Sequence, residues 1–545
     1  MPTIEVRIWD LERIARTSLQ YSEIEELLTK LKCEIEELRG DTLVYEASHD
    51  RPDLFSAEGL GRAIRTLKGV EKGFNELTLG NSGIELIATE APAYRPYVLM
   101  ALVKGLSLDD EAIRQLFQLQ EKLHATYCGD RALVSIGLYD FSKIKPPIYY
   151  KSVNEYSFKP LDSTEVMNIK EILEKTEKGI KYRHLVRQGN YPLLVDSVGT
   201  VLSLPPIINS EDTRVTTETT DVIIDVTGTD LDLMSRVLNV IIGALVERGT
   251  NVEVLKVKVV SKEGIIESPQ YHAKEFNVRL SDVSRLLGVN IRANDLINYL
   301  GIMGINVKSL NNEYVVIKIP PYRIDVMHPV DIIEEIAIAY GYDNLGTDIL
   351  PPTHPGSIHP IEKISRLFRD LMIGLGFNEV VNFMLIDSEY LSELGLSNYL
   401  VLENPKMKSY SAVRNSLIPS LLLAVKVNST SLKEIKLFEV GDVVEVNDGE
   451  ARSVRKFSCI IASPETTLTD ALVALKSLLS TLGIKYSLRP YEHPVMINGR
   501  CGCIVVNDVT VGIVGEIHPK ILNYLGINLP TAAIELNLSE LIKHL

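Results

Sequence analysis

Apolar residues recur every three or four positions in several stretches of this chain, and that spacing predicts amphipathic helices. In YSEIEELLTKLKCEIEEL, residues 21–38, one face would carry Ile24, Leu27, Leu28 and Leu31. A second helix is expected after Ser56, a residue type that caps helices, with Ala57, Leu60, Ile64 and Leu67 as its buried stripe. In residues 281–288, Ser281 and Gly288 are the expected cap and stop of a shorter helix.

Other stretches carry the signals of β-strands. The run DVIIDVTG, residues 221–228, is rich in Val and Ile, which predicts a strand buried on both faces. Near the C-terminal end, RCGCIVVNDVTVGIVGEI predicts a hairpin with Asn507 and Asp508 at its tip. Helices and strands are therefore both expected in every part of the chain, within an α+β multidomain organisation.

A chain of 545 residues exceeds what one hydrophobic core can organise, so several domains are expected. We predict an N-terminal α/β module at 1–85, a mixed α/β domain at 86–265, a small helix-and-strand module at 266–348 and a last domain, built on an antiparallel sheet, at 349–545. The fold class is α+β multidomain.

Net charge and apolar content limit how this chain could contact RNA or a membrane. The net charge is −15, so any RNA contact must use local basic patches or a partner chain. No stretch approaches the ~20 apolar residues of a membrane span, and the charged N-terminus lacks a signal sequence, so a cytoplasmic protein without membrane contact is expected. The five cysteines have no zinc spacing and are expected to be reduced core residues.

Four acidic residues stand close together in PPYRIDVMHPVDIIEEIAIAYGYDNL, residues 320–345: Asp325, Asp331, Glu334 and Glu335. On a helix beginning near Pro329, the last three would share one face. Carboxylates gathered in this way suit a hard divalent cation. An alternative is a capping box, with Asp331 as N-cap and Glu334 as its partner. The pattern alone leaves both interpretations open.

The stretch R-I-D-(x)5-D-I-I-E-E-I-A-(x)2-Y-G-Y-D-N resembles the signature of the β subunit of phenylalanyl-tRNA synthetase. In that family the four acidic positions bind Mg2+, at a site shared with the α subunit. The resemblance therefore implies that Asp325, Asp331, Glu334 and Glu335 are magnesium ligands. The string D-R-P-D-L-F-S-x-E-G-L-x-R, residues 50–62, resembles the N-terminal module of the same subunit, although a capped helix after a proline turn explains it without any site.

Two polar clusters in the second domain are candidates for a small-ligand pocket. They are residues 204–210, around a Pro-Pro turn, and residues 225–229, at the end of a buried strand. An apolar wall with a few fixed polar groups is what such a pocket needs, while turn and cap duties are the alternative. The resemblance implies an editing domain that hydrolyses tyrosine wrongly attached to the phenylalanine tRNA. Its implied pocket residues are Asn209, Ser210, Asp225 and Thr227.

The phrases VRNSLIPSLL, LFEVGDV and GIVGEIHP resemble the catalytic-like domain of the β subunit, which has the class II synthetase fold. An active class II enzyme needs a late Gly-x-Gly-(x)2-Arg segment for the γ-phosphate, and this sequence has none. No P-loop or other glycine-rich nucleotide motif occurs either. This domain is therefore expected to be inactive, with Arg414 and Glu439 as scaffold.

The resemblance implies the β subunit of an α2β2 phenylalanine–tRNA ligase. The α subunit would use ATP to charge tRNA(Phe), while this chain would edit mischarged tyrosyl-tRNA(Phe), bind Mg2+ and support assembly. Two alternatives are a non-enzymatic RNA-binding scaffold with an idle pocket and a self-sufficient class II ligase. Hydrolysis of mischarged tRNA would separate the first alternative from the editing hypothesis, and ATP–pyrophosphate exchange would reveal the second.

Overall fold

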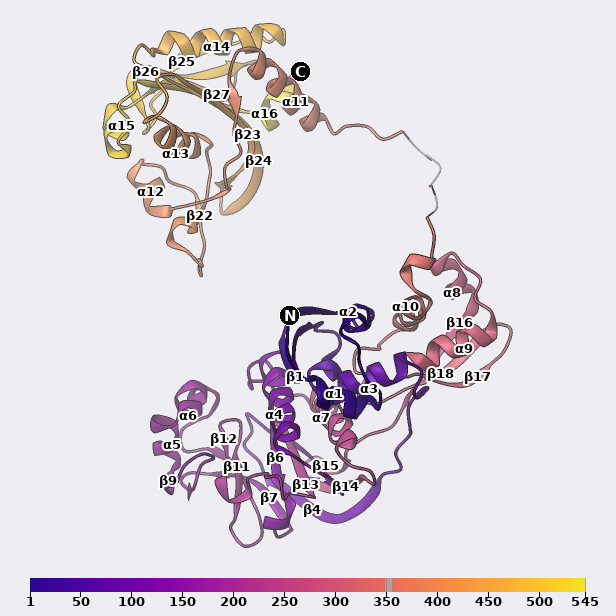
Figure 1. Ribbon diagram of the computed structural model, residues 1–545. Coiled ribbons are helices and arrows are strands. Elements are labelled where there is room, and N and C mark those ends of the chain that lie inside the picture. Colours follow the sequence, from indigo (N-terminus) through magenta and orange to yellow (C-terminus); the bar gives the residue numbers. More distant parts are fainter. Residues whose placement is uncertain (348, 350–354, 545) are drawn as a thin grey trace. The chain divides into compact units, whose positions relative to one another are not determined.

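The computed structural model describes residues 1–347, 349 and 355–544, and it divides into two compact units, Met1–Ile349 and Leu350–Leu545. Each unit is a mixed α/β structure with its own sheets (Figure 1). In the part of the chain that is described, no helix combines the length and apolar character needed to cross a membrane. The boundaries expected inside the first unit, near residues 85 and 265, stay predictions.

The N-terminal part of the first unit is a small three-stranded sheet with helices beside it. The sheet has the order β1-β3-β2 and is antiparallel. Its elements are β1 (Thr3–Arg7), α1 (Ile8–Ala15), α2 (Tyr21–Lys30), β2 (Cys33–Arg39), β3 (Thr42–Ala47) and α3 (Ala57–Leu67).

The helix predicted over residues 21–38 was wrong in its second half. Helix α2 ends at Lys30, Lys32 takes a left-handed backbone conformation, and the chain continues as strand β2. The register of β2 against β3 shifts between Ile35 and Glu37. This bulge lets Ile35 and Leu38 both pack against the core. A strand with a bulge therefore imitates the three-residue spacing of a helix.

The largest element of the first unit is a ten-stranded sheet of order β12-β11-β10-β7-β4-β14-β5-β13-β6, with β15 paired to β14. Its strands are β4 (Gly80–Glu90), β5 (Tyr97–Lys104), β6 (Val134–Asp140), β7 (Ile148–Val153), β10 (Tyr191–Val195), β11 (Val201–Leu204), β12 (Ile208–Asn209), β13 (Val222–Gly228), β14 (Glu253–Ser261) and β15 (Gly264–Ser268). The associated elements are α4 (Asp110–Ala125), a small hairpin of β8 (Ser157–Phe158) and β9 (Met167–Asn168), α5 (Ile169–Lys175), α6 (Glu177–Tyr182) and α7 (Leu231–Leu245). Every residue of β13 is buried, as its Val and Ile content predicts.

The ten-stranded sheet and the N-terminal module share one hydrophobic core. Residues of α1, α3, α4, α7, β5 and β13 belong to the same buried cluster. An ion network also links the two: Arg248, which follows α7, donates to Asp10 of α1 at 2.7 and 2.9 Å and to Glu58 of α3. All three side chains are buried, so each charge depends on the others for compensation.

The third part of the first unit is a three-stranded antiparallel sheet of order β16-β18-β17 with three helices. Its elements are β16 (Lys274–Arg279), α8 (Leu280–Leu287), α9 (Ala293–Ile302), β17 (Asn306–Leu310), β18 (Tyr314–Ile319) and α10 (Pro329–Tyr340). The cap predicted at Ser281 was wrong, because α8 begins at Leu280 with Arg279 as N-cap, two residues earlier than expected. Gly288 ends the helix in the left-handed conformation, as expected.

The second unit is built on a seven-stranded sheet of order β19-β23-β24-β28-β27-β26-β25, antiparallel except between β19 and β23. Its strands are β19 (Asn378–Glu379), β23 (Ile435–Asn447), β24 (Glu450–Ala462), β25 (Ser487–Pro490), β26 (Met496–Val506), β27 (Val509–Ile517) and β28 (Thr531–Asn537), and a small sheet has β20 (Leu385–Ile386), β21 (Leu400–Val401) and β22 (Ala412–Val413). The helices are α11 (Pro360–Gly374), α12 (Ser388–Glu393), α13 (Ile418–Asn428), α14 (Leu468–Thr481), α15 (Pro519–Leu525) and α16 (Leu538–Leu541).

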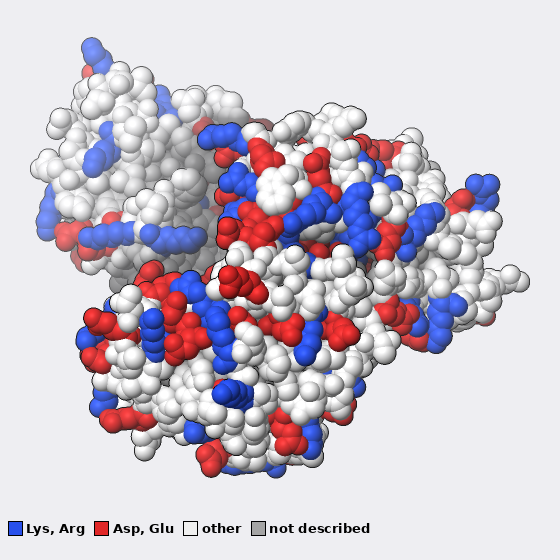
Figure 2. Space-filling view, turned by 60° about the horizontal axis from the view of Figure 1, so that its bottom comes forward, with Lys and Arg blue, Asp and Glu red and all other residues white. Residues whose placement is uncertain are grey.

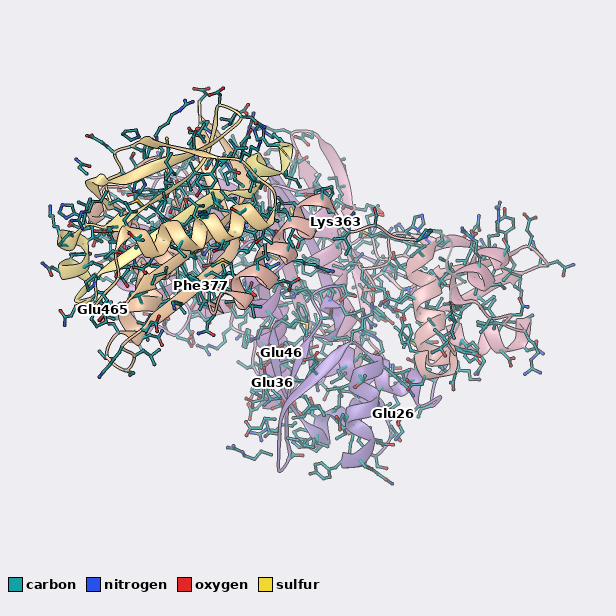
Figure 3. All side chains as sticks on the ribbon, turned by 90° about the horizontal axis from the view of Figure 1, so that it is seen from above. Glu26, Glu36, Glu46, Lys363, Phe377 and Glu465 are labelled. Atoms are coloured by element: carbon teal, nitrogen blue, oxygen red, sulfur yellow. The ribbon has the colours of Figure 1, made fainter. Side chains whose placement is uncertain are left out.

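Alternating residues of β24 divide the interior of the second unit into two cores. Phe457, Cys459 and Ile461 pack with α11 and α14, whereas Ile460 and Ala462 pack with α12, α13 and α15. Figure 3 places Lys363, Phe377 and Glu465 in this unit.

The predicted tip of the β26–β27 hairpin is confirmed, because Asn507 and Asp508 both take positive φ there.

Candidate hydrolytic pocket

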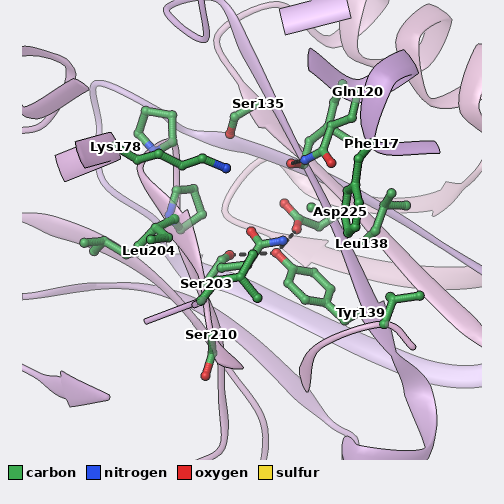
Figure 4. Close-up of a pocket in the computed structure, with 18 of the residues that line it drawn as sticks. Phe117, Gln120, Ser135, Leu138, Tyr139, Lys178, Ser203, Leu204, Ser210 and Asp225 are labelled. Carbon is green, nitrogen blue, oxygen red and sulfur yellow. Dashed lines mark hydrogen bonds between the residues drawn. The ribbon is translucent and has the colours of Figure 1, made fainter. Parts of the chain in front are cut away.

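Asp225 is the centre of a buried polar group on the ten-stranded sheet. It lies in the middle of β13, is 2 % exposed and hydrogen-bonds through Oδ1 with the Tyr139 hydroxyl of β6. The same hydroxyl lies 2.8 Å from Ser203 Oγ of β11 (Figure 4). No hydrogen bond joins the second carboxyl oxygen, Oδ2, to any residue that the structure describes. One face of Asp225 is therefore available to a ligand.

Burial changes the acidity of this carboxyl. Removal from water raises the pKa of Asp225 from 3.8 to about 7, although the Tyr139 hydrogen bond and the charge of Arg95 both act to lower it. A carboxyl whose pKa lies near neutrality changes its protonation state at the pH of the cell. It can therefore accept or donate a proton under those conditions.

Gly137 leaves the space that this group occupies. It stands opposite Asp225 in the β6–β13 register, and a Cβ atom at this position would lie 2.0 Å from Tyr139 Oη and 2.2 Å from Asp225 Oδ1. No side chain fits there without moving both groups. Gly137 is therefore required at this position, because any larger residue would displace Tyr139 and Asp225.

The polar group borders a cavity of about 190 Å³. Its walls are formed by α4, β6 and the Pro205–Pro206 turn, and they combine apolar and polar side chains. The residues that line the cavity include Phe117, Leu138, Leu204, Asn209, Ser210 and Asp225. Such a cavity, with apolar walls and a few fixed polar groups, suits a small organic ligand.

Arg131 holds one wall of the cavity in place. Its guanidinium donates to the carbonyls of Pro206 and Ile207, at 3.2 and 3.0 Å, and to Glu121 Oε1 at 2.7 Å. It also stacks 4.6 Å from the ring centre of Tyr182 on α6. Burial opposes ionisation of Glu121, but His124 and Arg131 outweigh it and hold the pKa of Glu121 at about 2. Glu121 is therefore a charged group at the cavity.

The four residues expected in the pocket have different surroundings. Asn209, Ser210 and Asp225 line the cavity. Thr227 is outside the lining: it is fully buried, accepts from Arg95 Nε at 3.0 Å and lies 2.9 Å from Ser135 Oγ. Ser210 caps a short turn, since its hydroxyl accepts from Asp212 N at 3.3 Å. Their roles in catalysis stay predictions.

The acidic residues of the third part are neutralised by side chains of the protein. Arg323 donates to both oxygens of Asp325, at 2.9 and 2.8 Å, and to Glu335 Oε1 at 2.5 Å. These charges hold the pKa of Asp325 below its ordinary value, although its burial opposes ionisation. Glu334 instead pairs with Lys32 of the N-terminal module, at 2.9 Å. Asp325 and Glu335 therefore share one cation, whereas Glu334 faces another.

The capping box predicted between Asp331 and Glu334 was wrong, because the helix begins at an earlier residue than that pairing requires. Helix α10 begins at Pro329 with His328 as N-cap, and Asp331 is the third helical residue. Asp331 Oδ2 accepts from the backbone N–H groups of Met327 and His328, both at 2.8 Å. The capping box therefore joins His328 and Asp331, not Asp331 and Glu334, because the helix starts earlier than that pairing requires.

A magnesium ion needs several oxygen ligands that converge on one point. Among the described residues, no group of three or more His, Cys, Asp or Glu side chains is arranged to hold a metal ion. The guanidinium of Arg323 lies between Asp325 and Glu335, where a shared cation would have to bind. One observation favours a further ligand: Glu335 Oε2 is buried and has no hydrogen-bond partner among the described residues. Ligation by all four carboxylates does not fit the side chains as they stand and stays a prediction.

Arg414 and Glu439 of the second unit form a buried ion pair at 2.8 Å, and each side chain is 2 % exposed. Asn382 donates to Glu439 Oε2 at 2.7 Å. These contacts join β23 to the segments before and after β22, which agrees with the structural role expected for both residues.

Comparisons with known proteins cover the whole chain. Three family models match: the B3/4 domain at residues 120–255, the tRNA synthetase B5 domain at 276–342, and the phenylalanyl tRNA synthetase beta chain CLM domain at 349–538. The phenylalanine–tRNA ligase beta subunit of Thermofilum pendens is 42% identical over 100% of this chain and 98% of its own length. That of Methanocaldococcus jannaschii is 37% identical over 99% and 100%.

Solved structures also match part of this chain. Among them is an N-terminal fragment of the phenylalanyl-tRNA synthetase beta subunit from Pyrococcus horikoshii, 41% identical, with a TM-score of 0.60. The match covers 63% of this chain and all of that fragment.

Proposed function

This chain belongs to the phenylalanine–tRNA ligase β-subunit family, and from that premise we propose that the cavity at Asp225 hydrolyses tyrosine wrongly attached to tRNA(Phe). The observation that carries the proposal is a buried carboxyl with a pKa of about 7 and one free oxygen on the wall of a small cavity. A synthetic site selective for phenylalanine excludes one added hydroxyl only modestly, so a second, hydrolytic site is useful.

The buried carboxyl explains how this site would distinguish tyrosine from phenylalanine. The phenol of a bound tyrosine donates a hydrogen bond to Asp225 Oδ2, and the ionised carboxylate makes that bond a strong one. A phenylalanine ring would instead cover the oxygen and leave it desolvated without a partner. A site built to bind a hydroxyl rejects the analogue that lacks it by about 10⁴-fold or more. The cavity therefore favours the mischarged amino acid.

The remaining expected residues are proposed to support the reaction. Asn209 lies in the cavity wall, where its amide can orient the ester or a water molecule. Thr227 acts through Arg95 and Ser135, which it contacts directly. Ser210 keeps the turn after β12 in place. Substitution of Asn209 is therefore expected to change hydrolysis more than substitution of Ser210.

Hydrolysis of tyrosyl-tRNA(Phe) by the full-length chain tests the proposal. The wild type is expected to hydrolyse this ester and to leave phenylalanyl-tRNA(Phe) intact. Asp225→Asn removes the charge and is expected to slow the reaction by about 100-fold, as lost charged hydrogen bonds do. Asp221→Asn, outside the cavity lining, is the matched control. If the folded wild type fails to hydrolyse the ester, the editing proposal is refuted and the scaffold alternative gains support.

We also propose that this β subunit pairs with an α subunit in an α2β2 assembly that charges tRNA(Phe). Several large apolar side chains of the second unit face solvent, and a partner would cover them: Val381 is 89% exposed, Val427 76% and Phe383 75%. The sequence lacks the late arginine motif, so the α subunit would hold ATP. ATP–pyrophosphate exchange is expected with the α subunit present and not with this chain alone; exchange by the isolated chain would contradict this division of labour.

Magnesium binding is proposed at Asp325, Asp331, Glu334 and Glu335 on the chemistry of oxygen ligands and the unpartnered oxygen of Glu335. Binding would require the pairs with Arg323 and Lys32 to open. Calorimetric titration of the full-length chain with MgCl2, compared with Glu335→Gln, measures this directly. Saturable binding that the substitution removes supports the site, and no saturable binding in either protein excludes it.

A further inference from the structure

A short basic segment borders the hydrolytic cavity. Residues 178–187, from α6 to the turn before β10, carry Lys178, Lys181, Arg183 and Arg187 and no Asp or Glu. All four cations are exposed. Lys178, Arg183 and Arg187 make no ion pair with any described residue, and Lys181 reaches Asp130 only at 3.9 Å. Their charges are therefore available to a partner.

This segment differs from the rest of the surface. The chain as a whole has a net charge of −15, and Lys and Arg side chains alternate with Asp and Glu over the face in Figure 2. Most surface cations pair with a carboxylate, as Lys308 does with Glu275 and Lys318 with Glu76. Carboxylates near the segment include Glu177, Asp130 and Glu121, whose pKa is lowered in part by the charge of Lys178. These ten residues carry four cations, so the segment is locally basic on an otherwise acidic chain.

The segment is attached to the cavity by direct contacts. Lys178 lies in the cavity lining, and Figure 4 shows its amino group directed towards the cavity. The Tyr182 ring is held between Arg131, at 4.6 Å, and Lys181, at 4.7 Å, and its hydroxyl donates to Asp130 at 3.0 Å. Because Arg131 also binds the Pro206 and Ile207 carbonyls, the basic segment and the cavity wall share one support.

The far end of the segment is also fixed. Arg187 stacks on Tyr94 at 4.9 Å, and the Tyr94 hydroxyl bonds to Asn190 O at 2.9 Å and accepts from Arg187 N at 3.3 Å. Cations held on aromatic rings keep their positions in the absence of a ligand. Lys181 and Arg187 are thus held in place on a basic segment whose first cation, Lys178, lines the cavity.

We propose that the basic segment binds the phosphates of the single-stranded 3′ end of the RNA whose aminoacyl ester enters the cavity. This inference rests on the proposed hydrolytic function. Phosphate contacts position a nucleic acid without reading its sequence, and lysine and arginine are the side chains that make them. A chain of this acidity needs such a local patch to hold RNA next to a buried carboxyl.

The test uses the full-length chain and the variant Lys181→Ala/Arg183→Ala/Arg187→Ala, which spares the cavity-lining Lys178. For single strands, the logarithm of affinity falls with the logarithm of salt concentration by about 0.7 for each phosphate contact. Loss of three contacts should raise KM for tyrosyl-tRNA(Phe) by about 50-fold at 0.15 M salt and reduce that slope by about 2. The kcat should stay within about twofold.

The matched control is Lys145→Ala/Lys262→Ala/Lys274→Ala, three exposed lysines of the same unit that form no ion pair with a described residue and lie outside the cavity lining. Hydrolysis of tyrosine ethyl ester, which has no phosphates, should be equal in all three proteins. If the two triple variants show the same KM, the inference is overturned while the hydrolytic function stands. If the wild type hydrolyses neither substrate, the proposed function itself fails.

A binding measurement keeps the inference testable in that last case. Fluorescence anisotropy of a labelled RNA hairpin ending in single-stranded CCA reports binding without chemistry. Weaker binding by the basic-segment variant than by the control variant supports the phosphate contact. Equal binding by the two variants refutes it.

Discussion

Asp225 should make the first unit less stable as the pH rises, and its replacement by asparagine should remove that dependence. The carboxyl has a pKa of 3.8 in water and about 7 in the fold, so the folded state holds a proton that the unfolded state has lost between these values. Stability contributed by the protonated form is fully present below pH 3.8 and is lost as the pH rises towards 7. Asparagine does not titrate.

The magnitude follows from the two pKa values. At 1.36 kcal/mol for each pKa unit, the ionisation penalty of Asp225 is about 4 kcal/mol at pH 8 and about 1.5 kcal/mol at pH 5. Between pH 5 and pH 8, the free energy of unfolding of Asp225→Asn should therefore increase by about 2.5 kcal/mol relative to that of the wild type. Differences in packing between the two side chains are the same at both pH values and cancel from this comparison.

Urea denaturation of the full-length wild type and Asp225→Asn at pH 5 and pH 8 measures the effect. The single tryptophan, Trp9, lies in the same compact unit as Asp225, so its fluorescence reports the relevant transition. Asp221→Asn, a substitution at a partly exposed carboxyl, controls for changes at other titrating groups. If the stability difference between Asp225→Asn and wild type is the same at both pH values, burial does not raise this pKa and the argument for the site fails.

Three further outcomes are expected. Gly137→Ala should displace the hydroxyl of Tyr139 and abolish hydrolysis of tyrosyl-tRNA(Phe), with an overpacking penalty of about 1–3 kcal/mol in urea denaturation; retained hydrolysis would show that the close contacts are not required. Arg323→Met should destabilise the first unit by about 3–5 kcal/mol, because Glu335 would lose its buried cation and Asp325 would keep only the charge of Arg51, and added MgCl2 should restore part of the loss if the metal site exists. Hydrolysis of tyrosyl-tRNA(Phe) should increase as the pH rises through about 7, in step with ionisation of Asp225, and a pH-independent rate would assign that role to another group.

Sequence patterns predicted the elements whose signals were local. The buried strand over residues 222–228 and the Asn507–Asp508 hairpin both occur, because Val and Ile content and turn residues act within a few positions. The helix predicted to continue to residue 38 does not occur, because a β-bulge produces the same spacing of apolar residues. The competing signal, pairing of β2 with β3, depends on residues farther along the chain.

The pocket was predictable in part. Asp225 was expected in the pocket from the family resemblance, and it does line the cavity. Tyr139 and Gly137 were missed, because their contribution depends on which strand lies beside β13. The sequence SIGLYD does contain a signal, since Ser135, Gly137 and Tyr139 alternate and therefore share one face of a buried strand. A glycine inside such a strand indicates a close approach by another group.

The acidic segment shows the opposite limit. Its four carboxylates lie close together in sequence, a pattern that left a metal ion and a helix cap both open, and the family resemblance favoured the metal ion. The structure supplies two cations that sequence spacing does not reveal as partners: Arg323, two residues before Asp325, and Lys32, about 300 residues before Glu334. Charge balance in a fold is set by neighbours in space, so a cluster of one sign in sequence does not establish which ion neutralises it.

Arg248 pairs with carboxylates on helices α1 and α3, and these ion pairs limit how the protein can be divided into separate domains. Asp10 and Glu58 come from the N-terminal module, whereas Arg248 belongs to the domain that carries the pocket. A chain shortened to begin at residue 86 would lose both carboxylates that pair with this guanidinium, together with the α1 and α3 residues that share the hydrophobic core with the large sheet. The pocket is therefore not a portable domain, and transplanting it into another enzyme would require the first 67 residues, through the end of α3, to move with it.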